Sequence, residues 1–309
     1  MAEHAMYFAD DKARKIHLAK TIISKFFCYL FLTIFALFIL TPFVLMVAGS
    51  FINYKSFHEF ATSGNFEWLG FSGGNWGFEN YKGIFEISKD FPVYFLNTFI
   101  VAIGSTTVTV VTSVLAGFAF ARLEFKGKEA LFTLLLATMM IPGEMMVITN
   151  IKTVQVFQWE NTYAALILVH GVSVFYVFYL RQTFQQIPNE LYLAAKVDGV
   201  SDIGYLFKVM VPIAMPPITT IIILSLMGAW NSYVWPNMVA SGYREGTKWS
   251  MKLVSNGLRD TFAINDTGAS NQEAIKIAGS MIVSAPLFLM FIIFRKYIMK
   301  GVSRSGIKG

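Results

Sequence analysis

The segment 188–212 combines acidic residues with paired alanines in a pattern that suits contact with a protein partner. Glu190 follows a proline that can begin a helix, and its carboxylate suits the positive end of the helix dipole. Ala194 and Ala195 give such a helix a small-residue surface that another backbone can approach closely, and Gly199 offers it a place to end. Periodicity alone favours a solvated loop here, and a short docking helix is the functional alternative.

The same segment continues toward the next apolar run. Asp198 and Gly199 precede a second short helix that we expect from Asp202 to about Val209, and this helix leads to Pro212. Two further prolines follow and mark the turn back into apolar sequence.

Polar side chains inside long apolar runs could contact a solute that crosses a membrane. Trp230, Asn231 and Tyr233 place aromatic faces beside an amide, which suits a sugar because sugars offer C–H patches and hydroxyls together. Helix packing is the alternative, above all for the serine and threonine residues that follow Thr98, since small hydroxyl residues let membrane helices approach and bond. The candidate path residues are Asn97, Thr98, Glu144, Trp230, Asn231 and Tyr233.

The remaining reactive residue types form no catalytic pattern. The four histidines are scattered, and Cys28 is the only cysteine, so no metal cluster, triad or internal disulfide is expected. For His170, a bond to a neighbouring helix is the plainer interpretation. Gly127 and Lys128 are followed by glutamate and lack the glycine-rich cradle of a nucleotide site. We therefore expect no enzymatic activity, metal or cofactor on this chain.

The elements that position these residues are apolar. Of 309 residues, 55% are hydrophobic and 14% are charged, whereas a soluble domain carries about 25% charged residues. Backbone groups in lipid must be bonded within their own segment, so the spans are expected to be helices, and an all-α polytopic membrane protein is predicted. The six predicted spans are 26–48, 97–121, 130–148, 163–180, 213–236 and 277–298, within a membrane domain 26–298 flanked by tails 1–25 and 299–309.

The distribution of positive charge predicts the orientation. Sixteen of the 25 Lys and Arg residues lie in the two tails and in the second and fourth connections, and nine lie in the first, third and fifth connections, although these contain more residues in total. By the positive-inside tendency both tails and the 188–212 segment are cytoplasmic, while the long connections 50–95 and 237–275 lie outside. The basic pI of about 9.2 is explained by this topology and by contact with lipid, and it requires no nucleic acid.

Several motifs in order resemble a known family. The stretch "IPNELYLAAKVDGVSDIGYLFKVMVPIAMPP" resembles the EAA loop of ATP-binding-cassette importer permeases, with Ala194, Ala195, Asp198, Gly199 and Pro212 at the matching positions. "LNTFIVAIGSTTVTVVTSVLAGFAFARLEFKGKEALF", "MMIPGE", "NTYAALIL", "YLRQTFQQIPNEL", "GAWNSYVWP" and "RKYIMKGVSRSGIKG" are similar to the carbohydrate-type branch, which includes the maltose importer's shorter membrane subunit. The resemblance covers nearly the whole chain from about residue 30.

One position departs from the family pattern. Where the motif has a glutamate before the two alanines, this chain has Leu193. In the family that glutamate resembles an anchor for a basic residue of the ATPase. Glu190 matches an earlier element of the motif, but on a helix it would lie near position 193. We therefore expect apolar contact from Leu193 to carry docking, with help from Glu190.

The resemblance implies the rest of an importer. It implies a second, homologous permease subunit, two ATPase subunits that carry ATP and Mg²⁺, an extracytoplasmic solute-binding protein, and a location in the bacterial inner membrane. It also implies that the 237–275 connection reaches toward the binding protein and that Lys300, Arg304 and Lys308 contact the ATPases. Oligosaccharides are the expected solutes, with sugar acids and glycerol phosphates as alternatives.

Two other function classes, a secondary transporter and a membrane enzyme or scaffold, would carry different sequence signals. A secondary transporter would work without an ATPase, and it typically carries charged residues within its spans for ion coupling, which these spans almost lack. A membrane enzyme or scaffold would need a cluster of titratable groups near the interface, and the sequence offers none.

Overall fold

The computed structural model describes residues 2–52, 76–264 and 272–303, and within them it is helical with only isolated β-bridges. The predicted tail residues Arg304 and Lys308, and the parts 53–75 and 265–271 of the long connections, lie outside the described residues. The helices are α1 (Ala2–Phe51), α3 (Glu79–Ile87), α4 (Phe91–Arg122), α5 (Lys128–Thr138), α6 (Gly143–Val156), α7 (Tyr163–Ile167), α8 (Val174–Gln185), α9 (Asn189–Val197), α10 (Asp202–Tyr205), the π-helical turn η2 (Leu206–Met210), α11 (Val211–Ile213), α12 (Met215–Trp230), α13 (Val234–Val239), α14 (Val254–Ile264) and α15 (Gln272–Ser303).

The chain divides into two compact units, and the first consists of Met1–Tyr81 with Glu273–Met281. Within it, the Asn80 side-chain amide donates hydrogen bonds to the carbonyls of Ser50 (3.0 Å) and Ile52 (2.8 Å). These bonds satisfy carbonyls at the end of α1, which have no partner within the helix. From Leu18 to Phe51, most apolar side chains of α1 are exposed, as expected for a helix that faces lipid.

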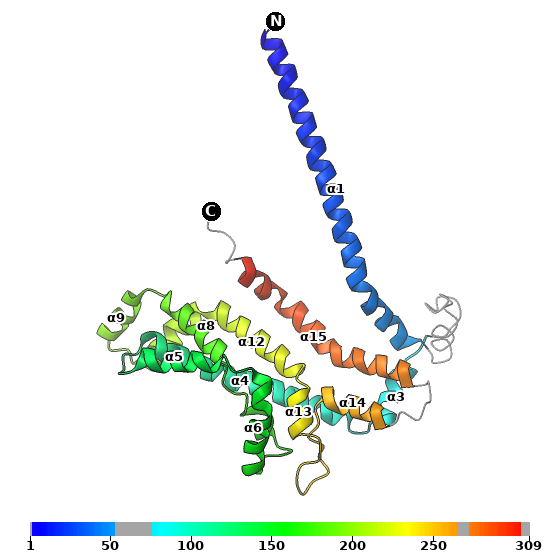
Figure 1. Cartoon of the computed structure of the whole chain (residues 1–309), viewed down its shortest axis with the longest axis vertical. Coiled ribbons are helices and arrows are strands. Elements are labelled where there is room, and N and C mark those ends of the chain that lie inside the picture. Colours follow the sequence, from blue (N-terminus) through cyan, green and yellow to red (C-terminus); the bar gives the residue numbers. More distant parts are fainter. Residues whose placement is uncertain (1, 53–75, 265–271, 304–309) are drawn as a thin grey trace. The chain divides into compact units, whose positions relative to one another are not determined.

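The second unit consists of Lys82–Gln272 with Ile282–Gly309 and is organised around α4. This helix packs against α8 and α12, which lie beside it (Figure 1). At Gly117 of α4 the approach is so close that a Cβ atom would lie 2.9 Å from Leu180 Cβ on α8. The core at this level includes Val114, Phe118, Leu180, Phe184 and Ile218.

A buried arginine ties three helices of this unit together. Arg181 of α8 donates two hydrogen bonds to the Glu129 carboxylate on α5, at 2.7 and 2.9 Å, and one to the Phe120 carbonyl on α4 at 3.2 Å. Its guanidinium also lies 3.9 Å from the centre of the Phe132 ring. Because Arg181 is only 8% exposed, this set of partners is what makes its burial tolerable.

Three described helices are long and apolar enough to cross a membrane, within α1, α4 and α15, at the places where spans 26–48, 97–121 and 277–298 were predicted. Two bent pairs raise the number to five if each pair is one span. The pair α5 and α6 is bent by 97°, and the stretch Asp202–Ile213 is bent by 82° against α12. The pair α5 and α6 occupies the region of the predicted span 130–148, which was expected as a single helix. In the predicted span 213–236, α12 ends at Trp230 and α13 begins at Val234, so this span is not one helix either, while Asp202–Ile213 belongs almost entirely to the 188–212 segment.

The predicted span 163–180 consists of two short helices, α7 and α8, rather than one. Thr162 and Ser173 each cap a helix start by accepting a hydrogen bond from a backbone N–H, and the chain between the helices is not helical. The Thr112 hydroxyl of α4 donates to the Gly171 carbonyl at 2.8 Å. Side-chain bonds of this kind allow non-helical backbone where protein surrounds it.

Candidate functional site

The segment 188–212 folds as two short helices around a left-handed turn. Helix α9 ends where Gly199 adopts φ +72°, a conformation that disfavours residues with a Cβ atom. The Gly199 N–H bonds to the Lys196 carbonyl (3.1 Å) and the Val200 N–H to the Ala195 carbonyl (2.9 Å), which is the Schellman pattern of helix ends. Helix α10 then begins at Ser201, whose hydroxyl accepts from the Gly204 N–H at 3.1 Å. The structure thus contains the predicted helix around 190–197 and the predicted second helix from Asp202.

The inner side of the segment is anchored in the core of the second unit. Tyr205, Leu206 and Met210 are each fully buried, and they belong to the same core as Phe118 and Phe184. The second short helix continues beyond α10 through η2 and α11, so that these residues reach α4 and α8. The segment is therefore anchored in the bundle on this side, and the solvated-loop interpretation is wrong for these residues.

The outer side of the segment is apolar and uncovered. Leu193 is 55% exposed and Val197 is 88% exposed, four residues apart on α9. Ile203 and Phe207, again four residues apart, are each 56% exposed. We call these four residues the apolar face. A charged segment that leaves large apolar side chains in solvent is typical of a protein-binding surface.

A polar brace joins α9 to α10. The Asp202 carboxylate accepts a hydrogen bond from the Tyr192 hydroxyl at 2.6 Å and forms an ion pair with Lys196 Nζ at 2.7 Å. The bond to Asp202 raises the pKa of Lys196, and partial burial together with the same carboxylate raises the pKa of Tyr192. The brace fixes the angle between the two helices.

Arg122, the last residue of α4, holds the start of the segment. Its guanidinium donates to the carbonyls of Phe184 (2.8 Å) and Ile187 and to Oδ1 of Asn189 (3.3 Å). The Phe184 carbonyl lies in the last turn of α8 and also accepts from the Ile187 N–H at 3.3 Å, while Ile187 lies beyond the helix end. One side chain thus connects α4, the end of α8 and the first residue of α9.

The predicted coupling residues lie together on this segment. Glu190, Ala194, Asp198 and Pro212 are exposed, as are Leu193 and Gly199, whereas Ala195 is half-buried and packs against the core. Within the described residues no salt bridge forms at Glu190, so its carboxylate is available to a partner.

A cavity of about 290 Å³, which we call the central cavity, is lined by residues of α4, α7, α8, α12 and α13 and of the chain next to them. Its wall carries hydroxyl groups and one imidazole on an otherwise apolar surface. The Ser225 hydroxyl is buried and has no hydrogen-bond partner among the described residues. The polar lining residues are Ser105, Thr109, His170, Ser173, Tyr176, Ser225 and Ser232. From the sequence, Ser105, Thr109 and His170 were predicted to serve helix packing, since no local pattern shows that α4 and the turn between α7 and α8 bring them to one space.

The predicted path residues do not line this cavity. Trp230 is 3% exposed, its indole N–H donates to the Val283 carbonyl at 3.1 Å, and its ring packs on Phe95 and Phe99. Asn231 is exposed just beyond α12. Tyr233 is half-buried, with the Arg259 guanidinium 4.9 Å from its ring centre.

Glu144 and the two residues at the start of α4 lie elsewhere. Glu144 is exposed in the first turn of α6, after the 97° bend. Asn97 is fully buried: its amide donates to the carbonyls of Ser250 (2.7 Å) and Lys252 (3.0 Å), and its Oδ1 accepts from Tyr163 (2.6 Å) and Trp249 (3.1 Å). This gives Asn97 a structural role.

Thr98 has a comparable structural role next to Asn97. Its hydroxyl donates to the Tyr94 carbonyl at 2.8 Å and accepts from the Val254 N–H at 2.9 Å, at the first residue of α14. Together the two side chains fasten the 237–264 region to the N-terminal end of α4.

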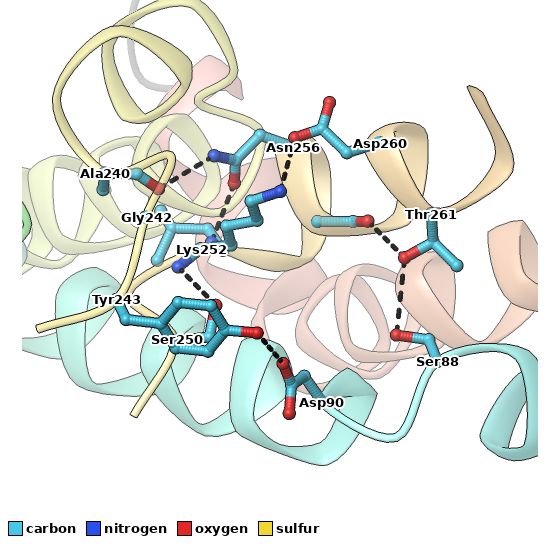
Figure 2. A network of polar contacts seen from close by, with 12 residues as sticks. Ser88, Asp90, Ala240, Gly242, Tyr243, Ser250, Lys252, Asn256, Asp260 and Thr261 are labelled. Carbon is cyan, nitrogen blue, oxygen red and sulfur yellow. Dashed lines mark hydrogen bonds and ion pairs between the residues drawn. The ribbon is translucent and has the colours of Figure 1, made fainter. Parts of the chain in front are cut away.

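A polar network surrounds this attachment (Figure 2). The Tyr243 hydroxyl donates to Asp90 Oδ2 at 3.2 Å, and Lys252 pairs with Asp260 at 2.8 Å. Asn256 accepts from the Leu253 N–H at 2.8 Å and donates to the Ala240 carbonyl at 3.3 Å. The charge of Asp90 raises the pKa of Tyr243. The region is therefore an ordered cap on α4 over the residues that the structure describes.

Comparisons with known proteins agree on one family. The family model described as binding-protein-dependent transport system inner membrane component matches residues 110–304. The arabinooligosaccharides transport system permease protein AraQ of Halalkalibacterium halodurans is 30% identical over 231 residues, which are 75% of this chain and 79% of that protein. The polygalacturonan/rhamnogalacturonan transport system permease protein YtcP of Bacillus subtilis is 28% identical over 290 residues, which are 91% of this chain and 96% of that protein.

A solved structure shares the fold. One chain in the crystal structure of a bacterial ABC transporter involved in the import of the acidic polysaccharide alginate matches this one with a TM-score of 0.73 at 20% sequence identity. The match covers 89% of this chain and 96% of that chain.

Proposed function

The chain belongs to the family of binding-protein-dependent transport system inner membrane components and is a transporter permease subunit, and from that premise we propose that it carries a saccharide and is driven by an ATPase through the 188–212 segment. The observation that carries this proposal is the two-sided segment itself. Its inner side is buried in the bundle, and its apolar face is exposed on the other side. Such an element transmits force from a docked partner to the helices.

Docking is assigned to the apolar face and to the residues that match the family motif. In this chain Leu193 stands where the motif has a glutamate, and its exposed side chain offers apolar area to the ATPase. Glu190, one turn earlier, supplies a carboxylate for a basic residue of the partner. Ala194, Ala195, Asp198, Gly199 and Pro212 shape the helix and the turn that present them.

The transport cycle then follows from differential binding. ATP closes the ATPase pair and displaces the docked segment, and Arg122 and the buried anchor residues pass the displacement to α4 and α8. The membrane helices alternate between an inward-open and an outward-open state. To shift the population ratio of the two states from 1:99 to 99:1, the ligands must bind one state better than the other by about 5.5 kcal/mol. ATP on one side and a loaded binding protein on the other supply that difference.

The solute path is assigned to the cavity and to the polar residues at the end of α12. The serine and threonine hydroxyls of the cavity, with the adjacent Asn231 and Tyr233, suit the hydroxyls and C–H faces of a sugar. Glu144 and Trp230 do not line the cavity, and they stay path residues on the sequence prediction alone. The two relatives named above are permeases for oligosaccharide or polysaccharide transport, which supports a saccharide as the solute.

The assembly proposed around the chain has four further parts: a second homologous permease, two ATPase subunits that bind ATP and Mg²⁺, and an extracytoplasmic binding protein. Both termini and the 188–212 segment face the cytoplasm in this arrangement. The exposed apolar helices suit a multi-pass protein of the bacterial inner membrane. Nothing in the comparisons favours a secondary transporter.

Purification from the host in mild detergent tests the proposal. We expect a second permease and an ATPase to accompany the chain, and ATP hydrolysis by the complex to be coupled to uptake of a saccharide into proteoliposomes. A chain that is purified alone and transports solute without ATP would refute the proposal.

A further inference from the structure

A short hairpin in the 237–264 region forms one wall of a second cavity. Tyr243 and Ser250 make an antiparallel bridge, the Arg244 N–H bonds to the Trp249 carbonyl at 2.9 Å, and the turn between them contains Gly246 at φ +70°. We call residues 242–251 the hairpin. The Asn97 amide of α4 donates to the Ser250 carbonyl in the second arm of the hairpin, which attaches the hairpin to α4.

The cavity beside the hairpin has an unusual lining. It measures about 620 Å³, is open to solvent, and is formed by two aromatic residues, two cations and one hydroxyl. Tyr163 comes from the start of α7, and the other four come from the hairpin. The lining residues are Tyr163, Arg244, Thr247, Lys248 and Trp249.

Hydrogen bonds from the polar groups of Tyr163 and Trp249 fix the positions of the two aromatic side chains. The Tyr163 hydroxyl and the Trp249 indole N–H both donate to Oδ1 of Asn97, at 2.6 and 3.1 Å. Their hydrogen-bonding groups are thereby used, and no stacked ring covers either face among the described residues. Fixed aromatic walls lower the entropy cost of binding a ligand that stacks on them.

The two cations are unpaired, in contrast to the nearby lysine. Lys252 is bonded to Asp260, whereas neither Arg244 nor Lys248 has an acidic partner within the described residues. Both side chains are exposed. Glu245 lies in the same turn but does not line the cavity. The cavity therefore presents net positive charge next to aromatic surface.

We propose that this cavity binds the acidic sugar units of an anionic saccharide, with the pyranose ring against Trp249 and Tyr163 and the carboxylate on Arg244 and Lys248. Arginine matches a carboxylate with two parallel donors, and Thr247 offers a hydroxyl for a ring substituent. A neutral sugar would use the aromatic walls but would leave both cations unpaired. The inference rests on the proposed function, because it identifies an acidic saccharide as a solute of the same transporter.

Calorimetric titration of the full chain, purified with its partner subunits into phosphatidylcholine nanodiscs, tests this site. Trigalacturonate is the anionic probe and galactotriose is the neutral control. We expect trigalacturonate to bind at least about tenfold more tightly than galactotriose, and Arg244→Gln and Lys248→Gln each to weaken its binding by about tenfold. Lys89→Gln, which removes an exposed cation outside the cavity, should leave binding unchanged.

Three results would overturn the inference. The first is equal binding of the two saccharides, and the second is anionic binding that survives both glutamine substitutions. The third is a pair of variants that lose association with a solute-binding protein while their affinity for trigalacturonate is unchanged, which would make the hairpin a protein-docking surface. The proposed function fails separately, because ATP-driven uptake of a neutral saccharide would persist if only this site were wrong.

Discussion

Asn97 and Arg122 lie on the same uninterrupted helix, α4, roughly 37 Å apart along its axis at 1.5 Å per residue. Asn97 fastens the hairpin region at one end, and Arg122 fastens the 188–212 segment at the other. A displacement of either attached region is therefore transmitted along one continuous helix, whose middle lines the central cavity through Ser105 and Thr109.

If displacements of the 188–212 segment are to reach α4 and α8 together, these two helices must pack closely. Gly117→Ala would place a methyl group 2.9 Å from Leu180 Cβ, an atom that cannot rotate away. We expect a loss of about 1–3 kcal/mol in stability, as for overpacking elsewhere. Gly228→Ala is the matched control, because a Cβ there meets nothing within 4 Å. Thermal unfolding of the purified variants measures the difference, and equal midpoints would contradict the packing described.

Arg181 is expected to be essential to the α4–α5–α8 junction. Arg181→Met removes the bonds to Glu129 and to the Phe120 carbonyl, and should cost about 2 kcal/mol, the usual scale for hydrogen bonds to charged groups. Glu129→Gln should cost less, because the amide still accepts one bond and the Glu129 side chain is largely exposed. Denaturation of the two variants in detergent gives the comparison. A Glu129→Gln loss as large as that of Arg181→Met would argue against this ranking.

The brace across the Gly199 turn has a pH signature. The hydrogen bond to Asp202 raises the pKa of Lys196, so its contribution to stability is complete below the unfolded value of about 10.4 and is lost as pH rises through the folded value. NMR titration of labelled lysine side chains should show a Lys196 midpoint above the ordinary range. Asp202→Asn should return the midpoint toward that range, and a midpoint that does not respond would mean that the brace does not form in solution.

The central cavity provides a test of the solute path. Ala229→Phe places a large ring in a space of about 290 Å³ and should reduce saccharide uptake strongly. ATP hydrolysis by the same complex should persist, since the 188–212 segment is untouched. Uptake of labelled saccharide and phosphate release, measured on the same proteoliposomes, separate these effects. Normal uptake by a correctly folded variant would exclude the cavity from the path.

Much of the fold is readable from local sequence, and the exceptions have physical reasons. The apolar runs in α1, α4 and α15 are long enough to identify by composition, and Gly199 predicts the end of α9 because few other residues adopt its backbone conformation. The break between α7 and α8 could not be predicted, because the Gly171 carbonyl is satisfied by Thr112, a residue far away in sequence.

In the functional regions too, features built from contiguous residues could be predicted, whereas features built from residues far apart in sequence could not. The 188–212 segment is predictable because its residues are contiguous, and α9 forms as the pattern indicates. The central cavity, the Arg122 anchor and the four bonds of Asn97 each depend on elements that meet only in the folded chain. The only sequence feature that pointed to a role for Arg122 is its position as a basic residue directly after the predicted span 97–121.

The most direct test of ATPase coupling is ATP hydrolysis by the reconstituted complex with substitutions at Leu193. Leu193→Asp puts a charge on the apolar face without touching the buried core, whereas Leu193→Met keeps the apolar area as the matched control. We predict that the aspartate lowers saccharide-stimulated hydrolysis, and retention of the ATPase, by roughly tenfold or more, as for a central interface residue, and that the methionine leaves both near wild type. Unchanged hydrolysis and ATPase retention with Leu193→Asp would contradict the account.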